Sequence, residues 1–204
     1  METDLKALFG DIDIYLFDQL LKGRMTKDMR ILDAGCGSGR NLVYLLQSGY
    51  SVVAFDRSEA AIAEVRRLGA KCSPNWRDEQ ARVETAEQLS FRSESFDFII
   101  SSAVLHFAHN EEHFEQMTDE LWRVLAPGGR LFARLASTIG MEEAMPPLGD
   151  GQFLLPDGSR RFLVNEERIV ALVERLSGQL YEPLKTVIVA GKRCMTTLCI
   201  QKQN

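Results

Sequence analysis

The 204-residue sequence lacks the features that mark several classes of protein. Its four cysteines form no C-x-x-C pair and have no histidines at metal-ligand spacing, so we expect reduced thiols and no metal site. No apolar run approaches about 18 residues, and no basic segment followed by an apolar one opens the chain, so neither membrane insertion nor export is expected. Lysines and arginines form no block and the net charge is −5, which argues against nucleic acid as a partner. We therefore expect a cytoplasmic protein.

What remains is the composition of an ordinary globular protein. Hydrophobic residues make up 45% of the chain and charged residues 26%, which argues against disorder, a coiled coil or a disulfide-built mini-protein. A chain of this length buries about 70% of its unfolded surface and can hold its own core. No repeat or low-complexity segment interrupts it. We expect one domain, present as a monomer or a homodimer.

The most informative part of the sequence is a glycine-rich segment at residues 30–40, RILDAGCGSGR. Ile31 and Leu32 predict the end of a buried strand, and residues 41–47 have helical spacing, so the glycines between them form a strand-to-helix turn. Such a turn needs positive φ angles and lets a ligand approach the backbone, while the following helix offers unpaired N–H groups. Physical reasoning alone predicts a site for a nucleotide or a small anion.

A second acid follows the turn at the distance used by nucleotide-binding folds. Residues 49–56 predict a strand that ends at Asp56, about 20 residues beyond the glycines, where a carboxylate can hold a ribose diol. Ser58 is better placed to cap the next helix, which we expect Gly69 to end. Asp56 is thus left free for a ligand.

Residues 33–39 resemble the D-x-G-x-G-x-G first motif of the class I S-adenosylmethionine-dependent methyltransferases. The G-x-G-x-x-G spacing of dinucleotide-binding loops fails, because Arg40 stands where its third glycine would be. Residues 85–91 resemble the family's D-A-E-x-L-P-F segment, with Thr85 in place of the acid and Ser90 in place of the proline. Further matches in the family's order are the F-D-x-apolar strand that leads to V-L-H at 95–107, the L-x-P-G-G segment at 125–129, and two final strands at 184–190 and 194–200.

The resemblance implies a doubly wound α/β fold. We expect a Rossmann-like, mostly parallel seven-stranded sheet with an antiparallel last strand, helices on both faces, and a small β-hairpin insertion. The whole chain then forms one methyltransferase domain. Its expected parts are an N-terminal helical cap at 1–27, a cofactor-binding core at 28–137, the hairpin insertion at 138–165, and a helix with the terminal β-hairpin at 166–204.

The family also implies S-adenosylmethionine as the cofactor and S-adenosylhomocysteine as its product. A helix over 12–21, with Asp11 as its cap, either packs over this cofactor through Tyr15 or simply covers one side of the sheet. Glu87 either contacts the adenine or lies in solvent. The residues expected to bind the cofactor are Asp33, Gly35, Cys36, Gly37, Gly39, Asp56, Arg57, Ala86, Glu87, Ser101 and Tyr15.

Two side chains are candidates for contact with the methyl acceptor. His106 follows the strand beside the methyl donor, where it acts as a general base or forms part of the pocket wall. Arg134 lies within an apolar strand, where an unpaired charge is costly. It therefore either binds an acidic group of the acceptor or forms an internal ion pair.

The acceptor itself is expected to be a small molecule, because the chain is compact and acidic. We expect Phe153, Leu155 and Phe162 of the insertion to close over it as a lid, with a protein-binding edge as the alternative. Other functions left open are a protein methyltransferase, a cofactor-binding subunit without catalysis, and an NAD-linked oxidoreductase. The N-P-P-Y signature of many amino methyltransferases is missing at residues 101–104.

Overall fold

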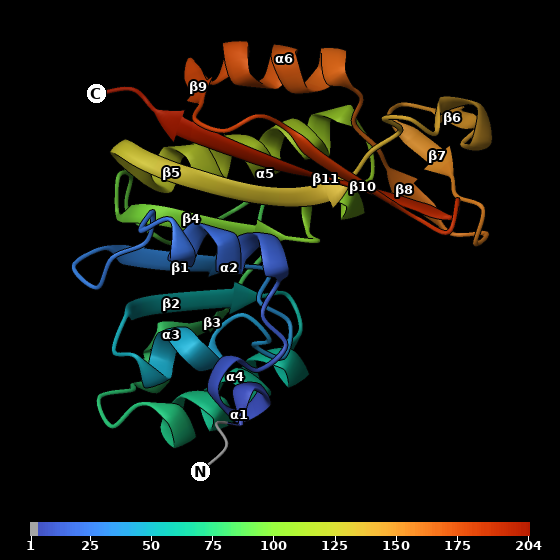
Figure 1. Ribbon diagram of the computed structural model, residues 1–204. Helices are drawn as coiled ribbons and strands as arrows, with labels where there is room; N and C mark the ends of the chain where they lie inside the picture. The colour runs from blue at the N-terminus through green and yellow to red at the C-terminus, as the bar shows by residue number, and fades with distance from the viewer. Residues whose placement is uncertain (1–3) are drawn as a thin grey trace.

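The computed structural model describes residues 4–204, so residues 1–3 of the expected N-terminal cap lie outside it. Its centre is a sheet in the order β10-β11-β5-β4-β1-β2-β3, with the short β9 paired to β11 (Figure 1). β1 to β5 are parallel, and β11 runs antiparallel to both β5 and β10. The expected fold is confirmed, with β9 as an addition. The strands are β1 (Arg30–Ala34), β2 (Ser51–Asp56), β3 (Ala81–Val83), β4 (Phe96–Ser102), β5 (Leu125–Ala136), β9 (Gly178–Leu180), β10 (Lys185–Val189) and β11 (Arg193–Lys202).

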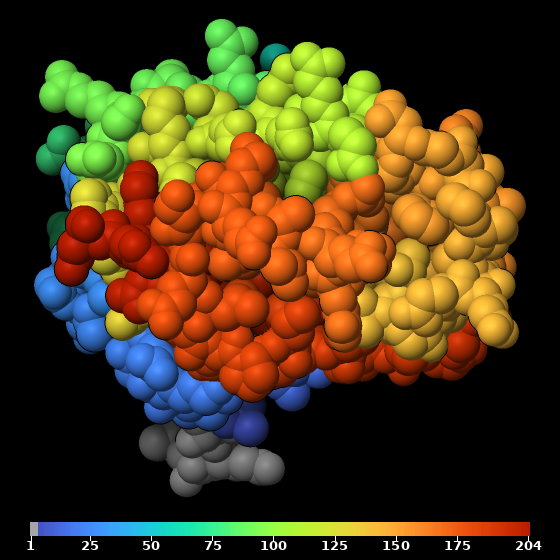
Figure 2. Space-filling model, turned by 90° about the horizontal axis from the view of Figure 1, so that it is seen from above, coloured from blue at the N-terminus to red at the C-terminus, as the bar shows by residue number. Residues whose placement is uncertain are grey.

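Helices cover both faces of this sheet because neighbouring residues of a strand point to opposite faces. Leu32 and Ile99 pack in a core with α5 and α6, whereas Ile31 and Phe98 pack in a second core with α2, α3 and α4. Seen from above, α6 fills the middle of the surface and borders both α5 and the insertion (Figure 2). Among residues 4–204, no helix has the length and apolar character needed to cross a bilayer. The helices are α1 (Leu5–Phe9), α2 (Ile14–Leu21), α3 (Val43–Gln47), α4 (Glu59–Cys72), α5 (Glu111–Val124) and α6 (Glu166–Arg175), with 3₁₀ turns η1 (Asp78–Gln80), η2 (Leu105–Phe107) and η3 (Glu142–Ala144).

Two expected helix boundaries are wrong. Gly69 does not end α4, which continues to Cys72; a Cβ at Gly69 would lie 2.2 Å from the ring of Trp76, so the glycine makes room for the indole. The cap of the N-terminal helix is Asp13 rather than Asp11, because Asp13 Oδ1 accepts a hydrogen bond of 2.9 Å from the N–H of Tyr15. Asp13 therefore stands at the start of α2, and its carboxylate lies beside the functional site described below.

The insertion forms a separate three-stranded sheet beyond the carboxyl ends of β4 and β5 (Figure 1). The expected hairpin is present as β7 (Gln152–Leu154) and β8 (Arg160–Phe162), and β6 (Pro147–Gly149) is an unexpected third strand. Phe162 does not face a cavity as expected: it is fully buried and stacks on Phe114 of α5, with ring centroids 4.6 Å apart. A small core of its own holds the rest in place, formed by Ala136, Met141, Met145, Leu155, Leu163 and Cys194.

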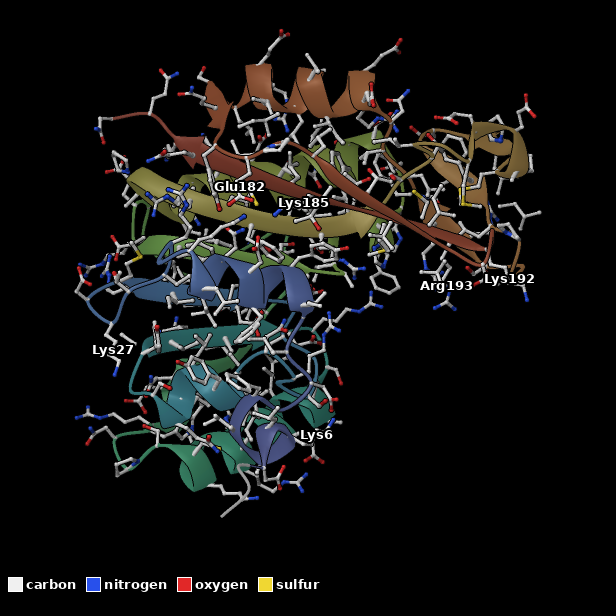
Figure 3. All side chains as sticks on the ribbon, viewed as in Figure 1. Lys6, Lys27, Glu182, Lys185, Lys192 and Arg193 are labelled. Carbon is white, nitrogen blue, oxygen red and sulfur yellow. The ribbon has the colours of Figure 1, made fainter. Side chains whose placement is uncertain are left out.

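Helix α2 is fixed to the far end of the chain by an ion-pair network. Asp18 of α2 accepts from Lys185 Nζ at 2.8 Å, and Lys22 Nζ lies 2.8 Å from a carboxylate oxygen of Glu182. Lys185 also pairs with Glu182, and the two lie side by side above α2 (Figure 3). The network therefore sets the position of the helix that begins at Asp13.

Candidate functional site

Two adjoining cavities open at the carboxyl ends of the strands, beside the point where the strand order reverses between β1 and β4. In open α/β sheets this is where ligands bind. We call them the β2-side cavity, of about 300 Å³, and the β5-side cavity, of about 660 Å³. Gly35, Ala103 and Phe107 line both cavities, so the two meet there.

The glycine turn has the backbone that its sequence predicts. Gly35, Gly37 and Gly39 have φ angles of +67°, +54° and +85°. A Cβ at Gly35 would lie 2.5 Å from Val104, and one at Gly39 would lie 2.8 Å from Leu68, so these two glycines permit close packing. No atom lies within 4 Å of a Cβ built at Gly37, so the backbone there is open to a ligand.

Asp56 connects the end of β2 to this turn. Its Oδ2 accepts from the N–H of Gly37 at 2.9 Å, and its Oδ1 accepts from the N–H of Ser58 at 2.9 Å. Ser58 caps α4 through Ala61, as expected. Each carboxylate oxygen keeps a second lone pair, and Asp56 lines the β2-side cavity, so it can still accept from a ligand.

Asp33, immediately before the turn, is buried without a partner for Oδ2 among residues 4–204. Burial raises the pKa of its carboxyl to about 7, with Arg40 opposing the shift and Asp56 adding to it. Burial also raises the pKa of the Cys36 thiol, which makes it a neutral wall group rather than a nucleophile. An unpaired buried carboxyl is suited to a cationic ligand group.

The structure distributes the expected cofactor residues unevenly. Ser101 is buried at 1% exposure with an unpaired Oγ, whereas its neighbour Ser102 lines the β5-side cavity. Tyr15 lies under the Arg134 guanidinium, 5.4 Å from ring centroid to Cζ, and lines neither cavity. Four of the other expected residues line the β2-side cavity: Asp56, Arg57, Ala86 and Glu87. Cys36 and Gly37 line the β5-side cavity, and Gly35 lines both. Asp33 and Gly39 line neither cavity.

Two histidines that were not among the expected site residues, His109 and His113, line the β2-side cavity. His113 Nδ1 accepts from the N–H of His109 at 3.1 Å, and the two rings stack with centroids 4.6 Å apart. His113 Nε2 lies 3.4 Å from Glu87. Burial raises the pKa of Glu87, but its own backbone N–H and His113 lower it by more, so the carboxylate stays ionised. His109 precedes Asn110, the cap of α5, so helical spacing does not explain the contact between the two rings, and no sequence pattern indicated it.

His106 lines the β5-side cavity, but its geometry does not suit a general base. Its Nδ1 accepts from the N–H of Ala136 at 3.3 Å, which leaves the ring proton on Nε2. Burial lowers the pKa of His106 to about 4, with the charges of Arg161 and Arg134 adding to the effect. A neutral ring whose lone pair is already taken can donate a hydrogen bond but cannot accept a proton easily.

Arg134 forms the internal ion pair that was one of its two expected roles. Its Nη1 lies 3.4 Å from Asp13 Oδ2, which also accepts from Arg40 Nη2 at 3.3 Å and from Ser102 Oγ at 3.1 Å. One buried carboxylate therefore serves two arginines. Arg134 still lines the β5-side cavity. Sequence reasoning missed Asp13 because it assigned the helix cap to Asp11, and because the partners of Asp13 lie far from it in the sequence.

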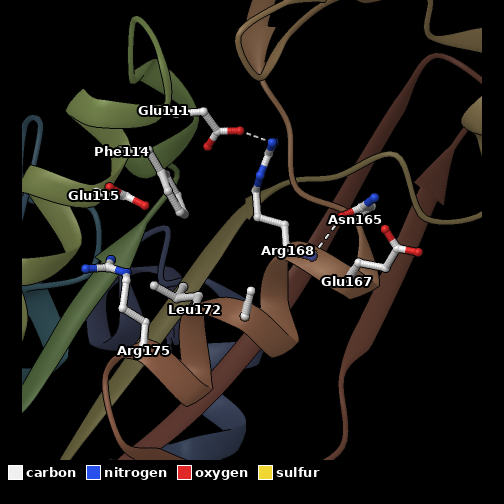
Figure 4. Close-up of a pocket in the computed structure, with 9 residues that line it drawn as sticks. Glu111, Phe114, Glu115, Asn165, Glu167, Arg168, Leu172 and Arg175 are labelled. Carbon is white, nitrogen blue, oxygen red and sulfur yellow. Dashed lines mark hydrogen bonds and ion pairs between the residues drawn. The ribbon is translucent and has the colours of Figure 1, made fainter.

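A third hollow, of about 430 Å³, lies between α5 and α6 (Figure 4). Arg168 crosses it to form an ion pair with Glu111. The backbone N–H of Arg168 also donates to Asn165 Oδ1, which caps α6. Arg175, also in the lining, forms an ion pair with Asp119 outside it, so both arginines of this hollow are paired. The hollow lies away from the carboxyl ends of the strands. Its lining is Glu111, Phe114, Glu115, Asn165, Glu167, Arg168, Ala171, Leu172 and Arg175.

Comparisons with known proteins agree with this geometry. The sequence model of a family described as a methyltransferase domain matches residues 32–133, half of the chain. The chain is 30% identical over 135 residues to YodH, an uncharacterized methyltransferase of Bacillus subtilis, covering 66% of this chain and 54% of that protein. It is 32% identical over 170 residues to a ubiquinone biosynthesis O-methyltransferase of Chelativorans, covering 76% of this chain and 64% of that one. The matched region thus spans less than two thirds of either relative.

Solved structures share the fold. A SAM-dependent methyltransferase from Methanosarcina mazei superposes with a TM-score of 0.69 at 24% identity, covering 90% of this chain and 97% of that one. The 1,6-didemethyltoxoflavin-N1-methyltransferase of Burkholderia thailandensis, with bound 1,6-didemethyltoxoflavin and S-adenosylhomocysteine, gives 0.69 at 17% identity, covering 98% of this chain and 82% of that one. The chain therefore belongs to the class I S-adenosylmethionine-dependent methyltransferases.

Proposed function

We propose that this protein transfers the methyl group of S-adenosylmethionine to a small molecule bound in the β5-side cavity. The observation that carries the proposal is the junction of the two cavities at Gly35, Ala103 and Phe107. A nucleoside in the β2-side cavity reaches the other cavity only through this junction. The relative from Burkholderia was crystallised with a small acceptor, which supports an acceptor of this size.

The residues present fit the cofactor. Asp56 has free lone pairs for the ribose hydroxyls, and the open backbone at Gly37 admits a ligand. The cavity wall at Ala86 and Glu87 is where the family's adenine-contacting segment falls. S-adenosylmethionine supplies a methyl group already activated on a sulfonium, so the chain must mainly orient the acceptor and exclude water.

Asp33 makes cofactor binding depend on pH. Asp33 lines neither cavity, so we propose that it acts on the ammonium group of the cofactor from behind the glycine turn. Its carboxyl has a pKa of about 7 and must lose its proton to attract that group. We expect the affinity for S-adenosylhomocysteine to fall about tenfold per pH unit below about pH 7 and to level off above it. Titration calorimetry across this range measures the slope. Asp33→Asn should bind more weakly at high pH and show no slope; an unchanged slope would remove Asp33 from the site.

His106 is proposed to orient the acceptor by donating from Nε2. Because burial lowers its pKa to about 4, the ring is neutral throughout the working range, and kcat/KM should show no inflection near the usual histidine pKa of about 6.5. His106→Gln keeps an N–H donor and should retain activity within about threefold, whereas His106→Phe should lose at least about tenfold. An inflection near pH 6.5 that disappears in His106→Gln would instead identify a general base.

We still propose that the chain divides into four parts, but we propose a different role for the insertion. The insertion at 138–165 has its own core and is anchored by Phe162, so we propose that it forms a fixed wall of the β5-side cavity rather than a lid. Leu155 contributes to this wall, and Phe153 packs behind it. From the last part of the chain, residues 166–204, the terminal hairpin lines the cavity through Val189, Arg193, Cys194 and Met195.

The proposed function is tested by supplying labelled S-adenosylmethionine and a cell extract separated by molecular size. Label in the small-molecule fraction, absent with Asp56→Ala, is the expected result. Label confined to macromolecules would indicate a protein or nucleic-acid acceptor. Tight binding of S-adenosylhomocysteine without any transfer would indicate a subunit without catalysis.

A further inference from the structure

We infer that the acceptor is a small organic anion and that Arg161 of the insertion binds its carboxylate or phosphate group. This inference rests on the proposed function, because it concerns the occupant of the β5-side cavity. Arg161 lies on β8, and its side chain lines that cavity. The argument has three steps: the charge of the wall, the position of Arg161, and the charge of the cofactor.

The wall of the β5-side cavity is strongly cationic. Arg40 and Arg134 share the single carboxylate of Asp13, and Arg193, near the tip of the terminal hairpin (Figure 3), pairs with Asp157 at 3.0 Å. Arg161 has no carboxylate within ion-pair distance among residues 4–204. The arginines around the cavity thus exceed their carboxylate partners by two charges, in a chain whose overall net charge is −5. Burial is the main reason that the pKa of His106 is lowered, and the charges of Arg161 and Arg134 add to the effect.

Arg161 is held beside the place where the methyl group must be delivered. Its guanidinium carbon lies 5.0 Å from the ring centroid of Phe107, the residue that lines both cavities. Its Nη1 donates to the carbonyl of Arg160 at 2.7 Å, which fixes the side chain further. The remaining N–H groups form a planar donor array suited to a carboxylate or a phosphate. A guanidinium fixed in this way loses little conformational freedom on binding an anion.

The positive charge of the sulfonium favours an anionic acceptor. A cationic sulfonium and an unpaired guanidinium repel one another across a partly buried junction, where screening is weak. A neutral or cationic acceptor would leave this repulsion in place, whereas an anion at Arg161 neutralises it. The cavity therefore selects against cationic amines and favours organic acids or phosphate esters.

The test separates candidate acceptors by charge before the reaction. A size-filtered cell extract is divided on an anion exchanger, and each fraction is incubated with enzyme and labelled S-adenosylmethionine. Separation before transfer matters because methylation of a carboxylate would itself remove the charge. Label should arise from the anion-exchange-bound fraction, and this fraction should raise the melting temperature of the S-adenosylhomocysteine complex. Elution with graded salt distinguishes phosphate esters from monocarboxylates.

Variants on one strand provide the matched comparison. When the anionic fraction limits the rate, Arg161→Gln should transfer methyl about 30-fold more slowly and lose the melting shift. Arg161→Lys keeps the charge but not the planar pair of donors, so it should recover only part of both. Arg160→Gln removes the same charge from the neighbouring exposed position and should behave as wild type. All three should bind S-adenosylhomocysteine with unchanged affinity.

Two outcomes would overturn the inference, and they are distinguishable from failure of the proposed function. Label from the unbound fraction alone, or equal behaviour of Arg161→Gln and Arg160→Gln, would exclude an anion at Arg161 while leaving small-molecule methyl transfer intact. Label found only in macromolecules would overturn both.

Discussion

Asp56→Ala should weaken S-adenosylhomocysteine binding by about 100-fold or more. The carboxylate accepts from the N–H of Gly37 and from the N–H of Ser58, so its loss removes the proposed ribose acceptor and also a hydrogen bond that fixes the glycine turn. Charge-assisted hydrogen bonds contribute roughly 1.5 to 3 kcal/mol each, and at least two are lost on the ligand side alone. Titration calorimetry measures the affinity directly.

Two variants separate the ligand contact from the turn. Asp56→Asn keeps the shape and one acceptor oxygen, so its loss should be intermediate, roughly tenfold. Ser58→Ala removes the α4 cap and should lower stability by about 1 kcal/mol with little change in affinity. If Asp56→Ala bound S-adenosylhomocysteine within about threefold of wild type at an unchanged melting temperature, Asp56 would not be a cofactor ligand.

Asp13→Ala should lower the free energy of unfolding by about 3 kcal/mol, most of it from two arginines left without their shared partner. Asp13 is only 5% exposed, and its carboxylate serves Arg40, Ser102 and Arg134 while it also caps α2. Arg40 is close to half exposed, so solvent screening limits its share. Chemical denaturation followed by circular dichroism gives the loss.

The matched control is Asp11→Ala, which removes an exposed acid two residues earlier whose only ion-pair partner among residues 4–204 is Lys6. It should change stability by less than about 0.5 kcal/mol. In an Arg134→Met background, Asp13→Ala should cost measurably less than in the wild type, because one unpaired charge is already gone. Equal losses in the two backgrounds would show that Asp13 acts as a helix cap alone.

The parts of this protein that follow local rules were predictable. The continuous apolar runs of β1 and β4, the positive-φ glycines and the acid at the end of β2 all depend on residues near one another in sequence. The sheet and the family followed from them. The register of β4 was harder: a shift of one residue exchanges Ser101 for Ser102 at the cavity, and periodicity alone does not fix a buried strand to that accuracy.

Long-range pairings could not be predicted in this way. Asp13 and Arg134 form an ion pair although 121 residues separate them in the sequence. Taken alone, Asp13 suggests only a helix cap, and Arg134 suggests only a costly buried charge. Arg161 likewise looks like an ordinary exposed residue of a hairpin until Phe107 is found beneath it. The site residues that tertiary packing brings together are therefore the ones that sequence reasoning left open or missed.

The ion-pair network of α2 has a consequence for the order in which this chain folds. Lys185 follows its partner Asp18 by 167 residues, and Glu182 follows its partner Lys22 by 160 residues. Contacts between such distant residues close late, because the intervening chain must be ordered first. Helix α2, and with it Asp13, should therefore dock after the central strands have paired. The acceptor cavity is completed last, so a folding chain can form its sheet before it can bind a substrate.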